Sequence, residues 1–220
     1  VPEAKRWNAE EPNLYEVHIT LRKAEEILEI HSKKIGFVSS RIEGNRLLVN
    51  DTPITIKGIN RHEHNPRNGR AVTVEQIASE LQNIKEHNMN AIRCAHYPNN
   101  PAFYEIASEI GIYVMDEGDL ETHGCYVTGD QGYLSKKPEW REAFLNRTIR
   151  MAERDKNETC IVLWSVGNEH GQGENVDFCV EYLREKFDGM PVLHSVDDPK
   201  EPKIGDFRTN GYFSMESLMS

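Results

Sequence analysis

The sequence predicts an α/β protein in which a short antiparallel β segment is followed by repeated strand–helix units. In the first fifty residues, apolar and polar residues alternate with a period of two, as in strands with one solvated face. From Pro53 onward, uninterrupted apolar runs alternate with stretches of helical periodicity, which is typical of βα units around a parallel sheet. We therefore expect residues 1–50 to be the trailing strands of a β-sandwich. Residues 51–220 form either an open doubly wound sheet or part of a (β/α)8 (TIM) barrel.

The antiparallel segment is too short to complete a sandwich by itself. Its alternation is clearest over residues 14–21 and recurs in shorter form at residues 27–30 and 41–43. The dipeptides Gly44-Asn45 and Asn50-Asp51 supply turn residues between these runs. The segment therefore reads as a set of strands joined by tight turns.

The predicted parallel strands are short and strongly apolar. They comprise residues 54–59, 91–95, 112–115, 161–166 and 192–196, with residues 210–213 as a candidate sixth. The sequence also contains residues that are typical of the beginnings and ends of the helices between these strands. Thr73 and Gln76 form a capping box, Pro101 begins the second helix and Gly111 ends it. Two further helical patterns cover residues 138–155 and 174–187.

Composition restricts the class of protein. A hydrophobic content of 38 % and a charged content of 28 % are ordinary for a globular domain. The formal net charge of −10 argues against nucleic acid or an anionic membrane as partner, because both need clustered Lys and Arg. We expect neither a signal peptide nor a membrane helix, because no such pattern opens the sequence and no run approaches the ~18 apolar residues that a membrane helix needs. It begins with Val1 instead of Met, so we expect the numbering to start inside a longer protein.

The four cysteines show no CxxC pairing, which argues against a disulfide framework or a zinc knuckle. Two of them, Cys94 and Cys160, lie in apolar strand-like runs and are expected to be buried free thiols. Free thiols and the absence of an export signal favour a cytoplasmic location.

Polar side chains follow four consecutive predicted strands, at the point where each strand leaves the core. These are Asn60-Arg61-His62-Glu63-His64, then Arg93 with His96, then Asp116-Glu117 with Glu121-Thr122-His123-Gly124, and finally Asn168-Glu169-His170. A barrel gathers the carboxyl ends of its strands at one rim, whereas an open sheet concentrates ligands at one switch point. The pattern therefore favours the partial TIM (β/α)8 barrel and one shared pocket. A carboxylic acid such as Glu169 at this rim can act as a proton donor near neutral pH.

Other roles for single residues stay open at this point. Asn168 and Glu169 would serve equally well as the cap of the following helix. Glu63 and His64 fit solvated loop positions, and Arg93 fits a structural ion pair within the barrel.

Two functions other than the one that Glu169 suggests also remain open for the protein. His62-x-His64 after the first strand is the type of pair that binds Zn²⁺ in amidohydrolases, although Asn168-Glu169 would then have no role. A non-catalytic sugar-binding module, or a subunit whose site is completed by another chain, is the third possibility.

Four segments together are more specific than their parts. Residues 56–64, 91–98, 121–124 and 164–169 resemble glycoside hydrolase family 2, in its lac-type β-galactosidase branch. Residues 7–21 resemble the end of the immunoglobulin-like domain that precedes the barrel in that family. The resemblance extends over nearly the whole chain, so it implies an immunoglobulin-like sandwich end followed by the first part of the catalytic barrel.

The resemblance implies a retaining β-galactosidase, in which one carboxyl group acts as acid/base and another as nucleophile. Glu169 corresponds to the acid/base, and Asn168 to the amide that binds the sugar 2-hydroxyl. His62 and His96 correspond to histidines that line the galactose subsite. The implied substrate is a terminal β-D-galactoside, with β-glucuronidase or another family 2 glycosidase as the alternative.

The resemblance also implies a cofactor. Glu121 and His123 correspond to ligands of a Mg²⁺ ion that Glu169 also contacts, and the complete enzyme is expected to use Na⁺ as well. The segment Glu121-Thr122-His123-Gly124 favours galactosidases, because the related glucuronidases lack this His. We expect the complete enzyme to be a homo-oligomer.

The nucleophile of the family is expected farther along the chain than these residues reach. The sequence ends 51 residues after Glu169, and neither Glu201 nor Glu216 follows an apolar strand. We therefore expect that the nucleophile and the last strands of the barrel lie outside this chain, and that the chain alone is inactive. His170 and residues 192–196 depart from the family pattern, which leaves the linkage and the substrate preference open.

Overall fold

The computed structural model describes residues 2–187 and 189–193, and its centre is a five-stranded parallel sheet. The strands lie in the order β10-β9-β8-β7-β6 and are β6 (Gly58–Arg61), β7 (Ala91–Cys94), β8 (Tyr113–Glu117), β9 (Ile161–Ser165) and β10 (Val192–Leu193). Neighbours in the sheet are neighbours in the chain, and all four pairs are parallel. A doubly wound sheet would reverse its order partway. The sheet is therefore the first part of a (β/α)8 barrel, as predicted.

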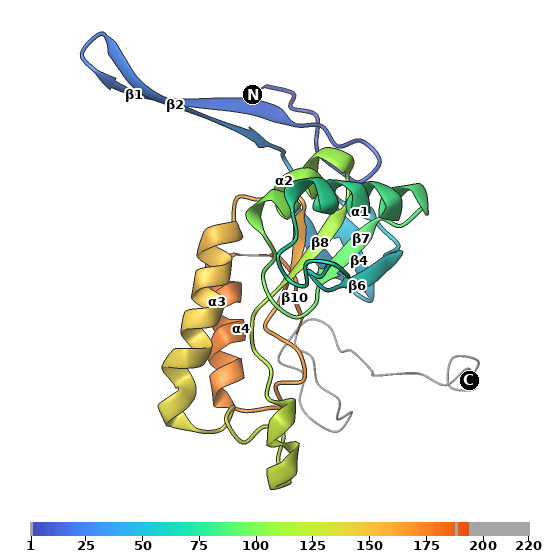
Figure 1. Cartoon of the computed structure of the whole chain (residues 1–220), viewed down its shortest axis with the longest axis vertical. Helices are drawn as coiled ribbons and strands as arrows, with labels where there is room; N and C mark the ends of the chain where they lie inside the picture. The colour runs from blue at the N-terminus through green and yellow to red at the C-terminus, as the bar shows by residue number, and fades with distance from the viewer. Residues whose placement is uncertain (1, 188, 194–220) are drawn as a thin grey trace.

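Helices connect successive strands (Figure 1). They are α1 (Val74–Glu86), α2 (Pro101–Ile110), α3 (Arg141–Asp155) and α4 (Glu174–Lys186), with the 3-10 helices η1 (His123–Thr128) and η2 (Pro138–Trp140) before α3. Thr73 and Gln76 form the predicted capping box, with each side chain accepting a hydrogen bond from the other's backbone N–H. Gly111 ends α2 in the left-handed conformation at φ 82°, as its position after the helix predicts. No helix among the described residues is both long and apolar enough to span a bilayer.

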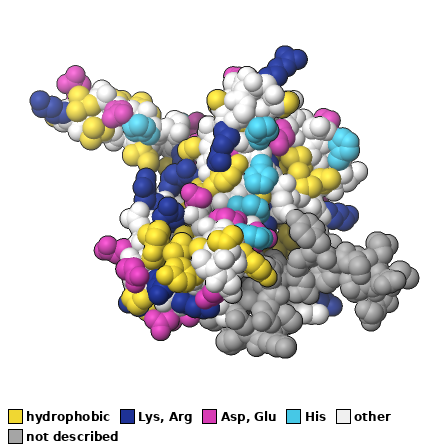
Figure 2. Space-filling view, turned by 60° about the horizontal axis from the view of Figure 1, so that its bottom comes forward, with side chains coloured by type: hydrophobic (Ala, Val, Ile, Leu, Met, Phe, Trp, Pro, Cys, Tyr) yellow, Lys and Arg dark blue, Asp and Glu magenta, His cyan; other side chains and the backbone are white. Residues whose placement is uncertain are grey.

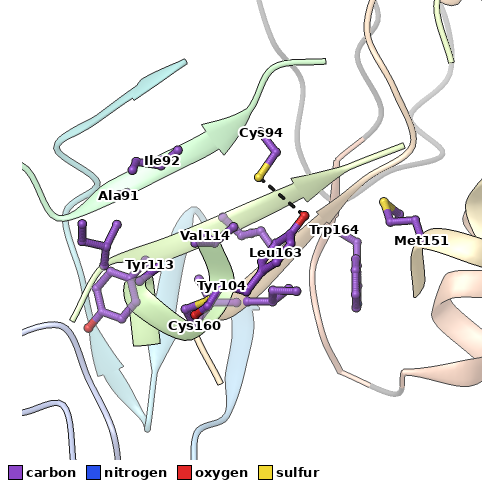
Figure 3. Close-up of a cluster of buried hydrophobic side chains, with 14 of the residues drawn as sticks. Ala91, Ile92, Cys94, Tyr104, Tyr113, Val114, Met151, Cys160, Leu163 and Trp164 are labelled. Atoms are coloured by element: carbon purple, nitrogen blue, oxygen red, sulfur yellow. Dashed lines mark hydrogen bonds between the residues drawn. The ribbon is translucent and has the colours of Figure 1, made fainter. Parts of the chain in front are cut away.

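The core lies between the sheet and the helices. Ile92 and Val114 point into it from the central strands, together with Tyr104 of α2 (Figure 3). Cys94 and Cys160 are fully buried and free, as predicted, and the Cys94 thiol donates to the Tyr104 hydroxyl over 4.0 Å. Burial raises the pKa of both thiols, so they remain protonated and unreactive.

The antiparallel part of the chain forms two small sheets. β1 (Tyr15–Lys23) and β2 (Glu26–Ile35) form a long hairpin that extends away from the body (Figure 1). β3 (Ser40–Glu43), β4 (Arg46–Val49) and β5 (Thr52–Pro53) form a three-stranded sheet whose central strand is largely buried. The alternation at residues 14–21, 27–30 and 41–43 thus predicted strands correctly.

The N-terminal region attaches to the parallel sheet at the amino ends of its strands. The indole of Trp7 is fully buried, and its Nε1 donates at 2.8 Å to the carbonyl of Ser108, in the last turn of α2, which precedes β8. The backbone N–H of Gly36 donates to the Thr159 hydroxyl at 2.8 Å, just before β9. This arrangement leaves the opposite, carboxyl ends of the strands to the connecting loops, which carry the polar residues.

Two predicted strands differ from the observed ones. The first was expected at residues 54–59 but is β6, Gly58–Arg61. The Asn90 side chain explains the later start, because it accepts from the Lys57 N–H and donates to the Thr55 carbonyl, taking the place of a neighbouring strand. The third was expected to end at residue 115, but β8 includes Asp116 and Glu117, both fully buried. Residues 194–196 and 210–213, Glu201 and Glu216 lie outside the described residues.

Candidate active site

Polar side chains from four strands meet at the carboxyl end of the sheet. We refer to them as the rim cluster, which consists of His62, Arg93, His96, Glu117, Glu121, His123, Asn168 and Glu169. Hydrogen bonds link most of these residues across strands. Figure 2 shows histidine side chains in a row on one face of the molecule, among acidic side chains. The convergence that was predicted from the strand ends is therefore present.

Two glycines bring the loops after β8 and β9 into close contact. A Cβ on Gly167 would lie 2.4 Å from the Leu120 carbonyl oxygen, and a Cβ on Gly118 would lie 2.4 Å from the Val166 carbonyl oxygen. The loops also share a backbone hydrogen bond from Asn168 N–H to the Leu120 carbonyl, at 2.9 Å. No other residue type fits either glycine position without moving backbone. The sequence pattern did not single out these glycines.

The close contact brings Glu121, His123 and Glu169 together. One ligand atom from each lies within 4.8 Å of the other two. His123 Nδ1 is hydrogen-bonded to Glu169 Oε2, and Asn168 Nδ2 donates to Glu121 Oε2 at 2.8 Å. The Glu169 side chain is 38 % exposed, so a substrate or an ion can reach it.

The backbone of Glu169 is held in an unusual conformation. Its φ is 42°, in the left-handed region that residues other than glycine avoid. Gln131 Nε2 donates to the Glu169 carbonyl at 2.7 Å, and Thr122 Oγ1 donates to the Gln131 carbonyl at 2.8 Å. The loop around Gln131 thus holds the backbone of Glu169 at its carbonyl group. Sequence reasoning missed Gln131, because nothing in its neighbours marks it.

Glu117 is the most connected acid of the cluster. Its side chain is fully buried. It accepts from Arg93 Nε at 2.6 Å and Ser165 Oγ at 2.7 Å, and it is hydrogen-bonded to His96 Nδ1 at 2.6 Å. Arg93 also donates to Asn168 Oδ1 at 3.0 Å. The ion-pair interpretation of Arg93 is confirmed. Glu117 was expected only as one polar residue at a strand end, and its three partners could not be read from spacing.

His62 contacts His96 at the edge of the cluster. Their ring centroids lie 5.3 Å apart and the rings are nearly perpendicular. Partial burial and the neighbouring His96 lower the pKa of His62 below its ordinary value, so the ring is neutral at pH 7. A neutral imidazole can donate one hydrogen bond and accept another, which suits recognition of hydroxyl groups.

The residues beside His62 do not form a zinc site. His64 is exposed, while Glu63 is half-buried and accepts from the Asn100 N–H at 3.1 Å, where α2 begins. Glu63 is therefore a structural residue and not the solvated loop residue that was considered. Among the described residues, the group of three metal-type donors is Glu121, His123 and Glu169, which includes neither His62 nor His64.

Comparison with known protein families gives two matches that together cover nearly all of the chain. The model for the TIM barrel domain of the family 2 glycosyl hydrolases matches residues 40–219. A second model, for family 2 glycosyl hydrolases, matches residues 1–37.

Curated relatives are β-galactosidases. The chain is 41 % identical over 187 residues to a β-galactosidase from Pectobacterium atrosepticum, and 42 % identical over 191 residues to one from Pseudoalteromonas haloplanktis. These matches cover 84 % and 86 % of this chain but 18 % of each relative. The chain thus spans about a fifth of the length of these proteins.

Solved structures with the same fold include β-glucuronidases. One from Ruminococcus gnavus, in complex with a C6-substituted uronic isofagomine, has a TM-score of 0.80 and 25 % identity, over 94 % of this chain and 37 % of that one. One from Dictyoglomus thermophilum has a TM-score of 0.80 over 90 % of this chain and 35 % of that one, and at 22 % identity it shows the fold alone.

Proposed function

The chain belongs to glycoside hydrolase family 2, and from this membership we propose that the protein carrying it hydrolyses terminal β-D-galactosides with retention of configuration. The observation that carries the proposal is the position of Glu169, which lies at the carboxyl end of β9 beside Asn168 and is accessible. The family assignment argues against the amidohydrolase alternative, since that chemistry belongs to a different family.

The choice of galactoside over glucuronide rests on two observations. The β-galactosidase relatives are 41–42 % identical to this chain, whereas the R. gnavus β-glucuronidase is 25 % identical. His123 also lies in the cluster, next to Glu169, where the galactosidase pattern expects it. β-Glucuronidase activity is the alternative outcome of a substrate test.

In the proposed reaction, Glu169 protonates the glycosidic oxygen as the leaving group departs and then deprotonates the incoming water. Asn168 and the histidines His62 and His96 would bind hydroxyl groups of the sugar. A retaining mechanism needs a second carboxylate about 5–5.5 Å from the acid/base. We propose that this nucleophile lies outside residues 1–220. Glu121 is hydrogen-bonded to Asn168 and belongs, with His123 and Glu169, to the group of three metal-type ligands. Neither Glu201 nor Glu216 follows an apolar strand. Residues 1–220 alone should then have no turnover.

We also propose that Glu121, His123 and Glu169 hold a Mg²⁺ ion. Two carboxylates and one imidazole with ligand atoms within 4.8 Å suit a divalent cation that retains several waters, although His is a less usual ligand of Mg²⁺. When bound, the ion would supply positive charge beside the reacting groups and fix the position of the Glu169 side chain. Na⁺ in the complete enzyme remains an expectation from the family resemblance.

The acid/base role is tested by Glu169→Gln in the complete protein. With a galactoside that has a poor leaving group, kcat/KM should fall by about 10²–10⁴, the usual contribution of a positioned acid. An aryl galactoside whose leaving group needs no proton should lose much less in its first step. Glu174→Gln, an exposed acid on α4, is the matched control. Turnover of Glu169→Gln within about twofold of the wild type on the poor substrate would contradict the assignment.

The metal role of Glu121 is separable from a nucleophile role. Glu121→Gln should raise the Mg²⁺ concentration that gives half-maximal activity by about tenfold or more, because one charged ligand is lost. Excess Mg²⁺ should then restore most of the activity. Activity that stays lost at saturating Mg²⁺ would instead identify Glu121 as the nucleophile.

Location and assembly are proposed in the same way. All four cysteines are free and three of them are buried, which fits a reducing compartment such as the cytoplasm. A homo-oligomer fits the large exposed apolar side chains on the β1–β2 hairpin. Sedimentation of the complete protein as a monomer would contradict the latter proposal.

A further inference from the structure

We propose that Glu117 is a positioning residue that fixes the tautomer and the orientation of His96, so that Nδ1 carries the proton and Nε2 is offered to the pocket. The first part concerns the chain alone. The second part, in which the substrate meets Nε2, rests on the proposed function.

The contacts of Glu117 leave little freedom for its carboxylate. The side chain is fully buried at the end of β8, and every contact comes from another strand or from the residues that follow one. Oε1 is hydrogen-bonded to His96 Nδ1, while Oε2 accepts from Arg93 Nε and Ser165 Oγ. A buried acid with both oxygens engaged is held in one rotamer, which makes it a rigid support for the groups around it.

The identity of each donor decides the tautomer of His96. Arg93 can only donate, and a charge-assisted ion pair with it at 2.6 Å favours the carboxylate form of Glu117. An ionised carboxylate has no proton to give, so His96 Nδ1 must be the donor in the 2.6 Å contact. The His96 side chain is 26 % exposed although Nδ1 faces a buried group, so the accessible edge of the ring is the opposite one, with Nε2.

Glu117 also acts on Asn168 through Arg93. The guanidinium that Glu117 holds donates to Asn168 Oδ1 at 3.0 Å, which directs Asn168 Nδ2 toward Glu121 at 2.8 Å. One buried acid thereby determines which atoms of two proposed substrate-binding side chains are donors and which are acceptors.

The proposal predicts a specific effect of the substitution Glu117→Gln on His96, because an amide has only one acceptor atom. The carbonyl oxygen must remain at the Oε2 position, since Arg93 Nε cannot accept a hydrogen bond. The NH₂ group then faces His96 Nδ1, which must become an acceptor. His96 should therefore change to the tautomer with its proton on Nε2.

Reaction with diethyl pyrocarbonate can detect this change of tautomer without any substrate, because the reagent acylates an imidazole nitrogen that has a free lone pair. In the complete wild-type protein His96 should react at Nε2. In Glu117→Gln its modification rate, mapped by mass spectrometry, should fall by about tenfold or more, the scale of a hydrogen bond to a charged group. Exposed His64 in the same protein is the internal reference. Ser165→Ala is the matched control, because it removes one bond to Glu117 and leaves the His96 contact.

Two results would overturn the proposal: an unchanged rate at His96 in Glu117→Gln, or an equal fall in Ser165→Ala. Loss of folding would instead raise the rates at all histidines. In that case a second pair of variants decides the question without changing Glu117. His96→Asn keeps a donor at the Nδ1 position and should retain the wild-type Tm. His96→Asp places a second carboxylate beside Glu117 and should lower the Tm. Equal Tm values for His96→Asn and His96→Asp would contradict the proposal.

Kinetics test the part that depends on substrate. If Glu117 acts through His96, then Glu117→Gln should lower kcat/KM in the wild-type background and have a much smaller effect in a His96→Ala background. An equal effect in both backgrounds would show that Glu117 does not act through His96. A complete protein that cleaves no β-galactoside would refute the proposed function, while the modification rates would still decide the tautomer.

Discussion

Asp116 and Glu117 are consecutive residues of β8 whose side chains lie on opposite faces of the sheet, as strand geometry requires. Glu117 faces the rim cluster, whereas Asp116 faces the helices and accepts from the Tyr104 hydroxyl at 2.6 Å. Burial, and next the charge of Asp155, raises the pKa of Asp116 well above its ordinary value. The titratable and charged groups around it are Tyr104 on α2, Arg154 and Asp155 on α3, and the thiols of Cys94 and Cys160.

A raised pKa at Asp116 makes stability depend on pH in a definite direction. The folded state holds a proton that the unfolded chain releases above the ordinary Asp pKa, so the free energy of unfolding falls as pH rises toward the raised value. Asp116→Asn keeps the acceptor for Tyr104 and cannot ionise. In the complete protein, Tm measured between about pH 5 and pH 9 should decline less steeply for Asp116→Asn than for the wild type.

The control for this prediction is Asp130→Asn. Asp130 is paired with Lys136, which lowers its pKa, so its contribution is lost only as pH falls. This variant should keep the wild-type slope above neutrality. Identical slopes for the wild type and Asp116→Asn would show that Asp116 does not hold the proton.

Residue types at strand ends could be predicted from the sequence, but their partners could not. The positions of His62, His96, Asn168 and Glu169 followed from counting polar residues after apolar runs, and the structure brings them to one rim. The roles of Glu117 and Gln131 depend on side chains far away in sequence, at Arg93 and at Glu169. No local pattern carries such information, because a Glu that ends a strand looks the same whether it is solvated or bound by three donors.

At the scale of elements, the contact between the loops after β8 and β9 depends on Gly167. Gly167→Ala would place a Cβ 2.4 Å from the Leu120 carbonyl oxygen and force the two loops apart. We expect a loss of about 1–3 kcal/mol in unfolding free energy, together with reduced activity, because Asn168 and Glu169 follow directly. Gly124→Ala is the control, since no heavy atom lies within 4 Å of its added Cβ. Equal Tm values for both variants would show that the loops adapt freely.

Helix ends were predicted better than strand ends, for a physical reason. The capping box at the start of α1 involves Thr73 and Gln76, which are three positions apart. The end of α2 is set by Gly111, whose N–H donates to the carbonyl of Ala107, four positions earlier. The start of β6 is set instead by Asn90, more than thirty residues away, whose amide replaces the strand pairing of residues 55 and 57. Strand limits therefore depend on pairing partners that a local pattern does not include.

At the scale of the molecule, much apolar surface is uncovered. Five large aliphatic side chains on the β1–β2 hairpin are 48–64 % exposed: Ile19, Leu21, Ile27, Leu28 and Ile30. A cavity of about 250 Å³ also lies against the parallel sheet, between residues such as Ile59, Met115 and Leu163. The overall α/β class and the strand order could be predicted, because they follow from the alternation of periods along the chain. The solvent exposure of each element could not be predicted, since it depends on packing between segments that are distant in sequence.

The isolated chain should therefore associate, and multi-angle light scattering should give a mass above 25.3 kDa that rises with concentration. Ile30→Lys should reduce this association, because it places a charge among the exposed apolar side chains of β2. Val127→Lys is the control, since Val127 is 92 % exposed but lies in η1, apart from the hairpin. A single mass of one chain across the concentration range would contradict the prediction.

The N-terminal region is attached at the amino ends of the strands, whereas the rim cluster lies at their carboxyl ends. A tether on the N-terminal region is therefore separated from the rim cluster by the sheet. Ala24 and Glu25 form the tip of the hairpin, far along the chain from every member of the rim cluster. A fluorescent label or an affinity handle at this tip should therefore leave the side chains of the rim cluster unmodified, and the chain could be immobilised on a surface through the tip.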